Sequence, residues 1–395
     1  MQEFDHKNLG GENMHSEMEM LRCAIVRGGT SKGVFILENA LPKDPILRDQ
    51  VILAIYGSPD LRQIDGLGGG DTLTSKLAII GPATHPDADI DYTFGQVSIT
   101  DAFVDYGGNC GNISSAVGPF AIDMGLVRIQ EPVTTIRIHL TNTGRILVAE
   151  VPVKNGRAAV QGDFSIDGVP GTGAKITLDW SDVVGGITGH LLPTGQAKDF
   201  IEAGGETYSV SIVDAGNVVI FIRAEELGLK GTETPMEIDS DEKLLERIEE
   251  IRGKVCEKIG MVKHWQDAKV ETPYQPFFAM VSAPTTHKCF NGVQICPDDV
   301  DVISRLTFML KMHKAYPVTG TVATGAAARI KGSIVWDLLS DQAKQADILK
   351  IGHPSGVIPI EAKCVGDKIT KLGVYRTARM IMDGYVYVRK SVYKE

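Results

Sequence analysis

Cysteine is scarce in this sequence, and no two cysteines are spaced as a metal-binding or redox-active pair. There is no CxxC motif, and no combination of cysteine and histidine has the spacing of a zinc site. In a chain of 395 residues, this pattern predicts free thiols in a reducing cytoplasm, with neither structural disulfides nor a bound metal. The six cysteines are Cys23, Cys110, Cys256, Cys289, Cys296 and Cys364.

Long apolar runs and excess positive charge are also lacking. No stretch approaches the roughly 18 apolar residues of a membrane-spanning helix, so we expect no membrane association. The net charge of −10 and the pI of about 5.5 argue against nucleic acid as a general partner. An anionic substrate would therefore need N–H groups, lysine or arginine gathered locally. The hydrophobic content of 43% is ordinary for a globular protein, and the length suffices for two domains.

The start of the chain lacks the apolar core of a secretory signal. This segment is polar and contains four methionines. We therefore predict a disordered leader over residues 1–20 and a fold that begins near Leu21.

Familiar nucleotide-binding and hydrolase signatures are missing too. No nucleophilic serine elbow is present. The loop Gly28–Gly33 has the composition of a phosphate-binding loop without the Walker spacing, and Asp65–Gly70 lacks the Rossmann fingerprint. The first of these loops is rich in hydroxyl groups, so Thr30 and Ser31 are candidate ligands for a carboxylate.

The most informative feature that is present is a Gly-rich turn with one cysteine, Asp105–Asn112. We expect strands at Gln96–Thr100 and Ala102–Asp105 before it, and a helix over Ile113–Gly118 after it. Such a turn directs free backbone N–H groups ahead of the helix, where the helix dipole favours a thiolate. Cys110 is thus a candidate for proton transfer or nucleophilic attack, the alternative being a buried cysteine in a tight turn. The candidate substrate ligands of this loop are Asn109, Gly111 and Asn112.

Lys76 is the second catalytic candidate. It follows the Gly-rich segment Asp65–Ser75 and lies in the apolar strand expected over Ser75–Ile80. A charged lysine is costly at a buried strand end, so burial would lower its pKa toward the range that is useful for a base. The alternative is a lysine that pairs with a nearby aspartate or extends to solvent. Gly69 and Gly70 leave room for a ligand beside it.

The rest of the chain alternates strands with helices. The other strands expected are Arg22–Arg27, Val34–Leu37, Thr135–Leu140, Arg145–Val151, Ser209–Val213, Val218–Ile222, Phe277–Ala283, Ile348–Gly352 and Val357–Ala362. The helices expected are Pro45–Tyr56, Asp241–Ile259, Ser304–His313 and a small-residue helix after Thr319.

An internal duplication is indicated by the spacing of these elements. The interval from Cys110 to Gly144 equals that from Val322 to Gly356, and each contains a loop, a small-residue helix, a strand, a turn and a strand. In this register Val322 takes the place of Cys110. Two similar halves would then face each other across a cleft, each contributing one helix N-terminus. The alternative is a coincidence between two ordinary α+β segments.

The second half supplies further candidate ligands. We place its helix N-terminus at Thr324-Gly325-Ala326, a seat for a carboxylate, with Thr321 close by. His353 and Ser355 lie in a turn that matches the first half's turn by the repeat. Plain turn chemistry explains those two residues equally well.

The predicted organisation is a first domain over residues 21–195 and a second over residues 196–383. The hinge is expected near Pro193–Gln196 and Ala203–Gly205. The last strand, about residues 384–395, is expected to return to the first domain.

The order of these motifs resembles the PrpF family, which has a diaminopimelate-epimerase-like fold. The resemblance covers nearly the whole chain after residue 20, and Ser58–Asp101 is most similar to members that act on methylitaconate. The matching segments are RGGTSKGVF (Arg27–Phe35), SPDLRQIDGLGGGDTLTSKLAII (Ser58–Ile80), DYGGNCGN (Asp105–Asn112), LPTGQ (Leu192–Gln196), DAGN (Asp214–Asn217), TGTVATGAA (Thr319–Ala327) and HPSG (His353–Gly356).

The resemblance implies an α+β fold of two similar domains, each a curled sheet around a central helix, with the site in the cleft between them. It implies a reaction without metal or organic cofactor, in which an isomerase moves a C=C bond in a small unsaturated di- or tricarboxylate such as methylitaconate or 2-methylaconitate. It gives Lys76 the role of main base, with Cys110 close to the substrate. Epimerases of this fold place two cysteines face to face, and Val322 in the second position argues against that chemistry.

Three alternatives remain open at this point. They are a 4-oxalomesaconate-type tautomerase, a two-base amino-acid epimerase, and a non-catalytic accessory protein of an aconitase-like enzyme. Removing a proton, holding a dienolate and reprotonating at the far carbon would suit Lys76 as base and Cys110 as acid or positioning group. The sequence leaves the oligomeric state open, a homo-oligomer included.

Overall fold

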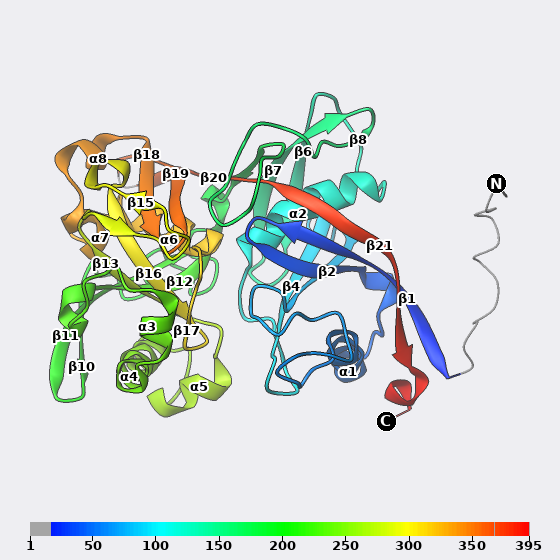
Figure 1. Cartoon of the computed structure of the whole chain (residues 1–395), viewed down its shortest axis with the longest axis horizontal. Helices are drawn as coiled ribbons and strands as arrows, with labels where there is room; N and C mark the ends of the chain where they lie inside the picture. The colour runs from blue at the N-terminus through cyan, green and yellow to red at the C-terminus, as the bar shows by residue number, and fades with distance from the viewer. Residues whose placement is uncertain (1–16, 367, 395) are drawn as a thin grey trace.

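The computed structural model describes residues 17–366 and 368–394, which form two lobes (Figure 1). Each lobe is a curled sheet around one helix, α2 (Gly111–Asp123) in the first lobe and α6 (Val318–Ala327) in the second. Most neighbouring strands are antiparallel, and in the described residues 19 strands join in one continuous sheet. The predicted α+β class is therefore confirmed, and the domain boundaries stay a prediction.

The first lobe contains α1 and α2 and most of the N-terminal strands. Its elements are β1 (Met18–Gly28), β2 (Ser31–Leu37), α1 (Pro45–Tyr56), β3 (Lys76–Pro82), β4 (Ile90–Val97), β5 (Val104–Asp105), α2, β6 (Val133–Leu140), β7 (Arg145–Lys154), β8 (Arg157–Ala158), β9 (Ile176–Asp179) and β21 (Ala378–Arg389).

The second lobe carries the other helices, and β20 (Lys368–Arg376) links the lobes by pairing with β19 and β9. Its elements are β10 (Asp199–Ala203), β11 (Glu206–Ala215), β12 (Asn217–Arg223), α3 (Pro235–Asp239), α4 (Glu242–Lys258), α5 (Ala268–Glu271), β13 (Phe277–Ser282), β14 (His287–Lys288), β15 (Gln294–Ile295), β16 (Val302–Phe308), β17 (Lys311–Met312), α6, α7 (Ile334–Leu338), α8 (Asp341–Gln345), β18 (Ile348–His353) and β19 (Gly356–Val365). The 3₁₀ helices are η2 (Glu38–Ala40), η3 (Ser181–Val183), η4 (Ala224–Leu227), η5 (Trp265–Asp267), η6 (Pro297–Asp299) and η7 (Lys390–Tyr393).

The long helices begin and end where their sequences indicate. The side chain of Asp44 accepts the backbone N–H of Leu47 at the start of α1, Pro45 opens that helix, and Gly57 ends it in the left-handed region at φ 69°. Asp241 caps α4 in the same way. The predicted helices Pro45–Tyr56 and Asp241–Ile259 are therefore confirmed.

Small residues make α2 a central helix. Eleven of its residues are buried, and strands from both sides of the curled sheet contact it. A Cβ on Gly118 would lie 2.7 Å from a methyl group of Val151, so only glycine lets β7 approach this closely. The sheet can therefore hold the N-terminal end of α2 in a fixed place.

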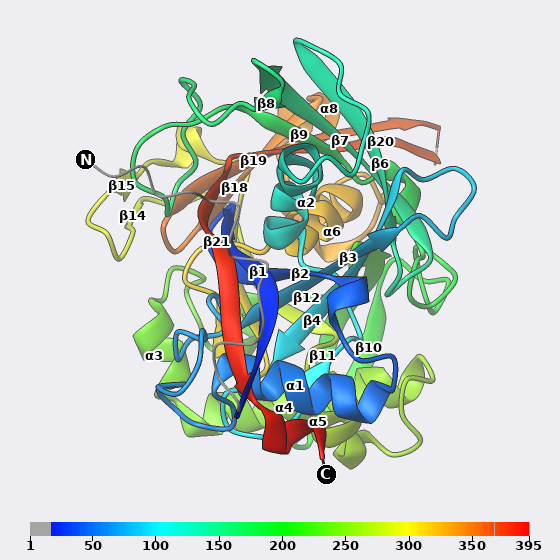
Figure 2. The ribbon, with the colours of Figure 1, turned by 90° about the vertical axis from the view of Figure 1, so that its right-hand side faces the viewer.

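The two chain ends of the described fold meet in the first lobe. β1 pairs with β21 along its whole length, from Met18 opposite Arg389 to Gly28 opposite Ala378 (Figure 2). The C-terminal strand thus returns to the first lobe. Met18–Met20 belong to β1, so the prediction that disorder extends to residue 20 is wrong for these three residues. The rest of the predicted leader, apart from Glu17, lies outside the described residues.

Three other local predictions are corrected. Ser304–His313 is not a helix but the hairpin β16–β17, whose turn residues Met309 and Leu310 have φ of 50° and 53°. The residues of β16 are buried on both faces of the sheet. A short segment of this kind has no alternation of apolar and polar residues that would distinguish a strand from a helix. The predicted loop Gly28–Gly33 is only a two-residue turn, and Gly204 and Gly205 form the β10–β11 turn instead of a hinge.

Candidate active site

Cys110 lies at the N-terminal end of α2, as the sequence predicts. It is the N-cap residue of this helix, and its side chain makes no capping hydrogen bond. The sulfur-bearing side chain is buried, with 6% of the residue exposed. The first N–H groups of a helix have no partner within the helix, so the backbone at Gly111 and Asn112 presents donors and the positive end of the helix dipole.

The N-terminal end of α6 faces that of α2. A Cβ on Gly111 would lie 2.4 Å from Cγ1 of Val318, the first residue of α6, so the two helix ends touch. Pro317 is the N-cap of α6. The predicted N-terminus at Thr324–Ala326 is therefore wrong, because six helical residues precede Thr324.

This geometry also changes the register of the repeat. The helix N-caps pair Cys110 with Pro317, and Val322 lies in the helix interior, fully buried. The equal spacing in the sequence misled because the turns that follow the two helices lie at different distances from them. No second thiol faces Cys110 in either register, since Cys110 is the one cysteine among the described residues that line the cavity between the helix ends.

Residues from both lobes line that cavity, which has a volume of about 10 Å³. The first lobe supplies Lys76 and Cys110, and the second lobe closes the cavity with three aromatic rings and a histidine. The lining residues are Ser31, Lys76, Cys110, Gly111, Asn112, Tyr274, Phe277, Phe308, His313, Pro317, Val318 and Thr319.

Lys76 is buried without a carboxylate partner among the described residues. Only 3% of it is exposed, and its Nζ donates to Oε1 of Gln96 at 2.7 Å. The nearby Asp71 instead pairs with Lys314 of the second lobe, at 2.5 Å. Burial lowers the pKa of Lys76, and the adjacent Cys110 side chain partly opposes this shift. The amine of Lys76 therefore loses its proton at a lower pH than the amine of a surface lysine does.

The β1–β2 turn brings the hydroxyl of Ser31 to this cavity, while Thr30 lies just outside it. Thr30 is fixed by Asn112, whose Nδ2 donates to its Oγ1 at 3.1 Å and whose Oδ1 accepts its backbone N–H at 3.3 Å. Ser31 lines the cavity with 2% of its surface exposed, and its Oγ has no hydrogen-bond partner among the described residues. Gly29 lets this turn approach α2, since a Cβ there would lie 2.1 Å from Oδ1 of Asn112.

His313 is a cavity residue that the sequence did not reveal. Its Nδ1 accepts the backbone N–H of Ala315 at 3.0 Å, which places the proton of the neutral ring on Nε2. Burial and the neighbouring Lys76 lower the pKa of His313 to about 3. The ring therefore offers a neutral N–H donor. Its position inside an expected helix hid it from sequence reasoning.

Asn217 joins the two helix ends. Its Oδ1 accepts the backbone N–H of Asn109 at 2.9 Å, and its Nδ2 donates to the Asn109 carbonyl and to Oγ1 of Thr319, both at 3.0 Å. Gly216 makes the bend before it at φ 80°. The DAGN motif is the signal that could have identified this role. Asn109 thus supports the loop and does not line the cavity.

We expect Asn217→Ala to lower the free energy of unfolding by about 2–3 kcal/mol, because it leaves buried donors and acceptors of Asn109 and Thr319 unpaired. Urea denaturation followed by circular dichroism measures this. Asn39→Ala, an exposed substitution on η2, should leave the free energy of unfolding unchanged. Equal effects of the two substitutions would show that the hydrogen bonds of Asn217 contribute nothing to the free energy of unfolding.

Several predicted ligands lie outside this cavity. Gly69 and Gly70 are exposed in the loop before β3. The hydroxyls of Thr321 and Thr324 donate to the carbonyls of Pro317 and Gly320, and Gly325 packs against Ile360. The Ser355 hydroxyl donates to the carbonyl of Lys314. His353 lines a separate, neighbouring cavity.

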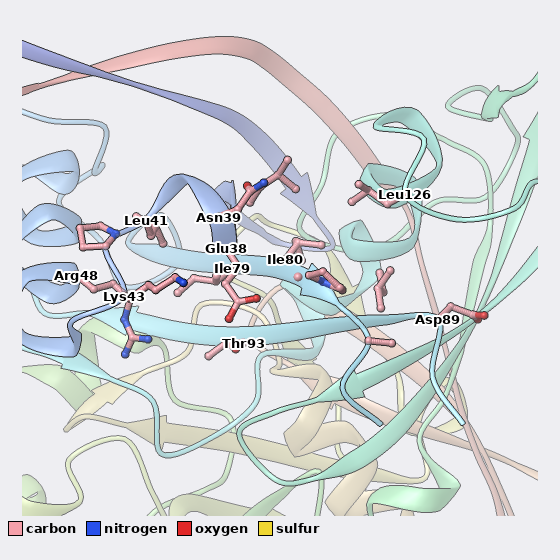
Figure 3. A pocket seen from close by; sticks show the side chains of 16 residues that line it. Glu38, Asn39, Leu41, Lys43, Arg48, Ile79, Ile80, Asp89, Thr93 and Leu126 are labelled. Carbon is pink, nitrogen blue, oxygen red and sulfur yellow. The ribbon is translucent and has the colours of Figure 1, made fainter. Parts of the chain in front are cut away.

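A larger cavity of about 790 Å³ lies along β3, between η2 and the loop after α2 (Figure 3). Charged groups at its wall include Glu38, Lys43 and Arg48, and neither Lys76 nor Cys110 lines it. Because this larger cavity lacks both candidate catalytic groups, the smaller cavity is the candidate active site. No group of three or more His, Cys, Asp or Glu side chains in the described residues could hold a metal ion.

The chain is similar to proteins of one family over nearly its whole length. Residues 18–389 match the family model described as PrpF protein. The chain is 53% identical to 3-methylitaconate isomerase of Eubacterium barkeri, covering 95% of this chain and 99% of that protein. It is 38% identical to 4-oxalomesaconate tautomerase of Pseudomonas putida (94% and 97%) and 37% identical to 2-methyl-aconitate isomerase of Shewanella oneidensis (93% and 96%).

Solved structures support the same fold. A crystal structure of methylitaconate-delta-isomerase superimposes with a TM-score of 0.80 at 53% identity, covering 95% of this chain and 97% of that one. A hydroxyproline epimerase from Agrobacterium vitis superimposes with a TM-score of 0.56 at 13% identity, covering 94% and 92%, which shows a shared fold alone. The predicted epimerase-like architecture is therefore confirmed.

Proposed function

The chain belongs to the PrpF family, and from this premise we propose that it is an isomerase that moves a C=C bond in a small unsaturated di- or tricarboxylate. Methylitaconate and 2-methylaconitate represent this substrate class. One observation carries the proposal most strongly, namely the buried amine of Lys76, which has no carboxylate partner in the described residues and lies beside Cys110 between two helix N-termini.

The reaction requires a proton shift and no net change in composition. In the proposed mechanism, neutral Lys76 removes an allylic proton from the substrate, and the electron pair of that C–H bond enters a dienolate. Cys110 then donates a proton to the far carbon, and the C=C bond has moved by one position. Proton transfer from the Lys76 ammonium to the Cys110 thiolate restores both groups.

Charge that develops in the dienolate spreads into a carboxylate. The N-terminal ends of α2 and α6 both reach the cavity through Gly111 and Val318. Their free N–H groups are fixed before the reaction begins, so they stabilise the developing charge without having to reorganise. The neutral His313 N–H adds a further donor.

The alternatives differ in what they require of the site. A two-base epimerase needs a second proton-transferring group opposite Cys110, and the facing helix end offers Pro317 and Val318. A 4-oxalomesaconate-type tautomerase would use the same Lys76 and Cys110 with another acid. An accessory protein of an aconitase-like enzyme would bind such acids without converting them.

Incubation of the purified protein with methylitaconate, trans-aconitate, 2-methyl-trans-aconitate and 4-oxalomesaconate tests the proposal. Formation of the isomer is followed by ultraviolet absorbance of the conjugated acid. Turnover of at least one acid supports the isomerase. Measurable binding without turnover of any of the four would favour the accessory role.

The proposal also covers the cofactor requirement, the cellular compartment and the oligomeric state of the enzyme. We propose a reaction without metal or organic cofactor, and an enzyme that works in the cytoplasm, where its six free cysteines would stay reduced. In the described part of the chain, no helix is long and apolar enough to cross a membrane. A homo-oligomer would be compatible with this function and is tested by light scattering.

Ser31→Ala should raise KM by roughly tenfold and leave the stability of the ligand-free protein unchanged. The Ser31 hydroxyl has no partner to lose in the described protein, whereas a bound carboxylate would accept its hydrogen bond. Steady-state kinetics and thermal unfolding measure the two quantities.

Ser333→Ala is the matched control. The Ser333 hydroxyl is equally buried, but it donates to the carbonyl of Ala327 and accepts the N–H of Trp336. This variant should unfold more easily and keep its KM. A Ser31→Ala variant with an unchanged KM would remove Ser31 from the substrate site.

A further inference from the structure

A second cavity, of about 240 Å³, adjoins the Lys76–Cys110 cavity. Two short segments line both cavities, and a hydrogen bond connects them at a third place. Thr30 lines the second cavity and Ser31 the first, and Tyr316 lines the second and Pro317 the first. The connecting residue is Asn112, which lines the first cavity and hydrogen-bonds to a residue of the second. One molecule could therefore extend from one cavity into the other.

That residue of the second cavity is Arg376, at the end of β20 where the chain crosses between the lobes (Figure 1). Its Nε donates to Oδ1 of Asn112 at 3.2 Å, and its Nη1 donates to the carbonyl of Tyr375 at 2.8 Å. Thr377, the next residue, is tied to the β1–β2 turn, since its carbonyl accepts the N–H of Gly29 at 3.0 Å. The guanidinium is therefore held in a fixed position.

Arg376 is a buried cation without a counter-ion in the described part of the chain. Only 4% of it is exposed, and no carboxylate among the described residues lies within ion-pair distance. Its Nη2 has no hydrogen-bond partner in the described protein. Burial lowers the pKa of Arg376 to about 9, and no nearby acid opposes this shift. A buried guanidinium that is left unpaired is costly, and a bound anion would remove that cost.

The other polar groups of the second cavity are compatible with a bound anion, because none of those described neutralises the charge of Arg376. His353 accepts the N–H of Ser355 at Nδ1, and burial lowers its pKa, so it is a neutral ring with its proton on Nε2. The one carboxylate at the wall, Asp167, is engaged by the backbone N–H of Val357 at 2.6 Å. Arg376 and His353 therefore supply donors, and Asp167 forms no ion pair with Arg376 in the described protein.

We propose that this second cavity binds the substrate carboxylate that does not share the dienolate charge, with Arg376 as its ligand. The inference rests on the proposed isomerase function and assigns a separate binding place to each of two substrate carboxylates. The substrate must carry two carboxylates, one at the two helix ends and one at Arg376. A planar guanidinium can pair with a carboxylate through two N–H groups, which also fixes its orientation.

Arg376→Gln tests this assignment with methylitaconate and with its monoamide, in which the carboxylate that takes no dienolate charge is replaced. We expect KM for methylitaconate to rise roughly a hundredfold while kcat falls much less, because a charge pair is lost from binding. The preference of the wild type for the dicarboxylate over the monoamide should largely disappear. Arg376→Lys should be intermediate.

Two measurements separate direct contact from general effects. Arg379→Gln removes the same charge from an exposed position three residues away and should leave KM unchanged. Calorimetry with 2,3-dimethylsuccinate, a saturated dicarboxylate that cannot isomerise, should show that Arg376→Gln loses binding without any catalytic step. Thermal unfolding confirms that each variant is folded.

The outcomes are distinct. If wild type isomerises methylitaconate and Arg376→Gln keeps both its KM and its preference for the dicarboxylate, the second subsite is wrong and the isomerase assignment stands. If wild type binds 2,3-dimethylsuccinate in an Arg376-dependent way but converts no acid, the subsite stands and the isomerase assignment fails.

Discussion

Lys76→Met should lose about 10³-fold or more of isomerase turnover and remain folded. Positioned general bases contribute roughly 10²–10⁴-fold to a rate, and no other amine lines the cavity in the described residues. The variant should also fail to exchange substrate hydrogen with deuterium from solvent, because no group remains to remove the allylic proton. Nuclear magnetic resonance of the substrate in D₂O follows this exchange.

The stability of this variant follows from the environment of the lysine. Lys76 lies against the rings of Phe94 and Phe308, with Nζ 5.4 and 5.5 Å from their centroids, and has no carboxylate partner in the described protein. Methionine has a similar length and carries no charge to desolvate. The free energy of unfolding of Lys76→Met should therefore be no lower than that of the wild type.

The pH dependence gives an independent check of the same lysine. Its pKa in the folded protein lies below the ordinary value of 10.5. Between these two values the unfolded chain binds the proton and the folded protein does not, so wild-type stability rises with pH in that window. The stability difference between Lys76→Met and wild type should shrink as the pH approaches 10.5. Wild-type activity should rise with pH as Lys76 loses its proton, up to the lowered pKa.

Lys371→Met is the control for Lys76→Met. Lys371 lies on β20 and pairs with Asp179 at 2.8 Å, away from the cavity. Its replacement should keep full turnover and deuterium exchange. Near wild-type exchange in a folded Lys76→Met variant would sink the assignment of Lys76 as the base.

Local signals in the sequence were sufficient to predict an element whose start and end are set by its own flanking residues. Pro45 after Asp44 starts α1 and Gly57 ends it, and the expected bounds match. The hairpin at Ser304–His313 was misjudged because burial on both faces of a sheet erases the alternation that identifies a strand. That error also removed His313 from the expected site.

Long-range arrangement explains the remaining differences. The paired helix ends depend on where α6 begins, and Pro317 marks that start only once Val318 is seen against Gly111. Asn217 holds Asn109, just before α2, and Arg376 holds Asn112, in its first turn, each from more than a hundred residues away in the sequence. Their roles come from where β12 begins and β20 ends, beside the start of α2, which no local pattern encodes.

The mechanism places Lys76 and Cys110 in successive steps, and the two variants should therefore fail differently. Cys110→Ser keeps the small polar side chain at the N-cap of α2 but replaces the thiol with a much weaker acid. We expect turnover to fall by about 10²-fold or more, while deuterium exchange at the allylic position of the substrate continues, because Lys76 still removes and returns that proton. Lys76→Met should lose both.

Comparing product formation with deuterium exchange in the same sample distinguishes the possible roles of Cys110. Cys256→Ser is the control, since this buried cysteine of α4 lies outside the cavity. If Cys110→Ser loses exchange and turnover in equal measure, the thiol is needed before the proton leaves, and positioning of the substrate is its role. If it keeps full turnover, Lys76 alone carries the proton between both carbons. Only continued exchange with lost turnover identifies Cys110 as the acid that completes the shift.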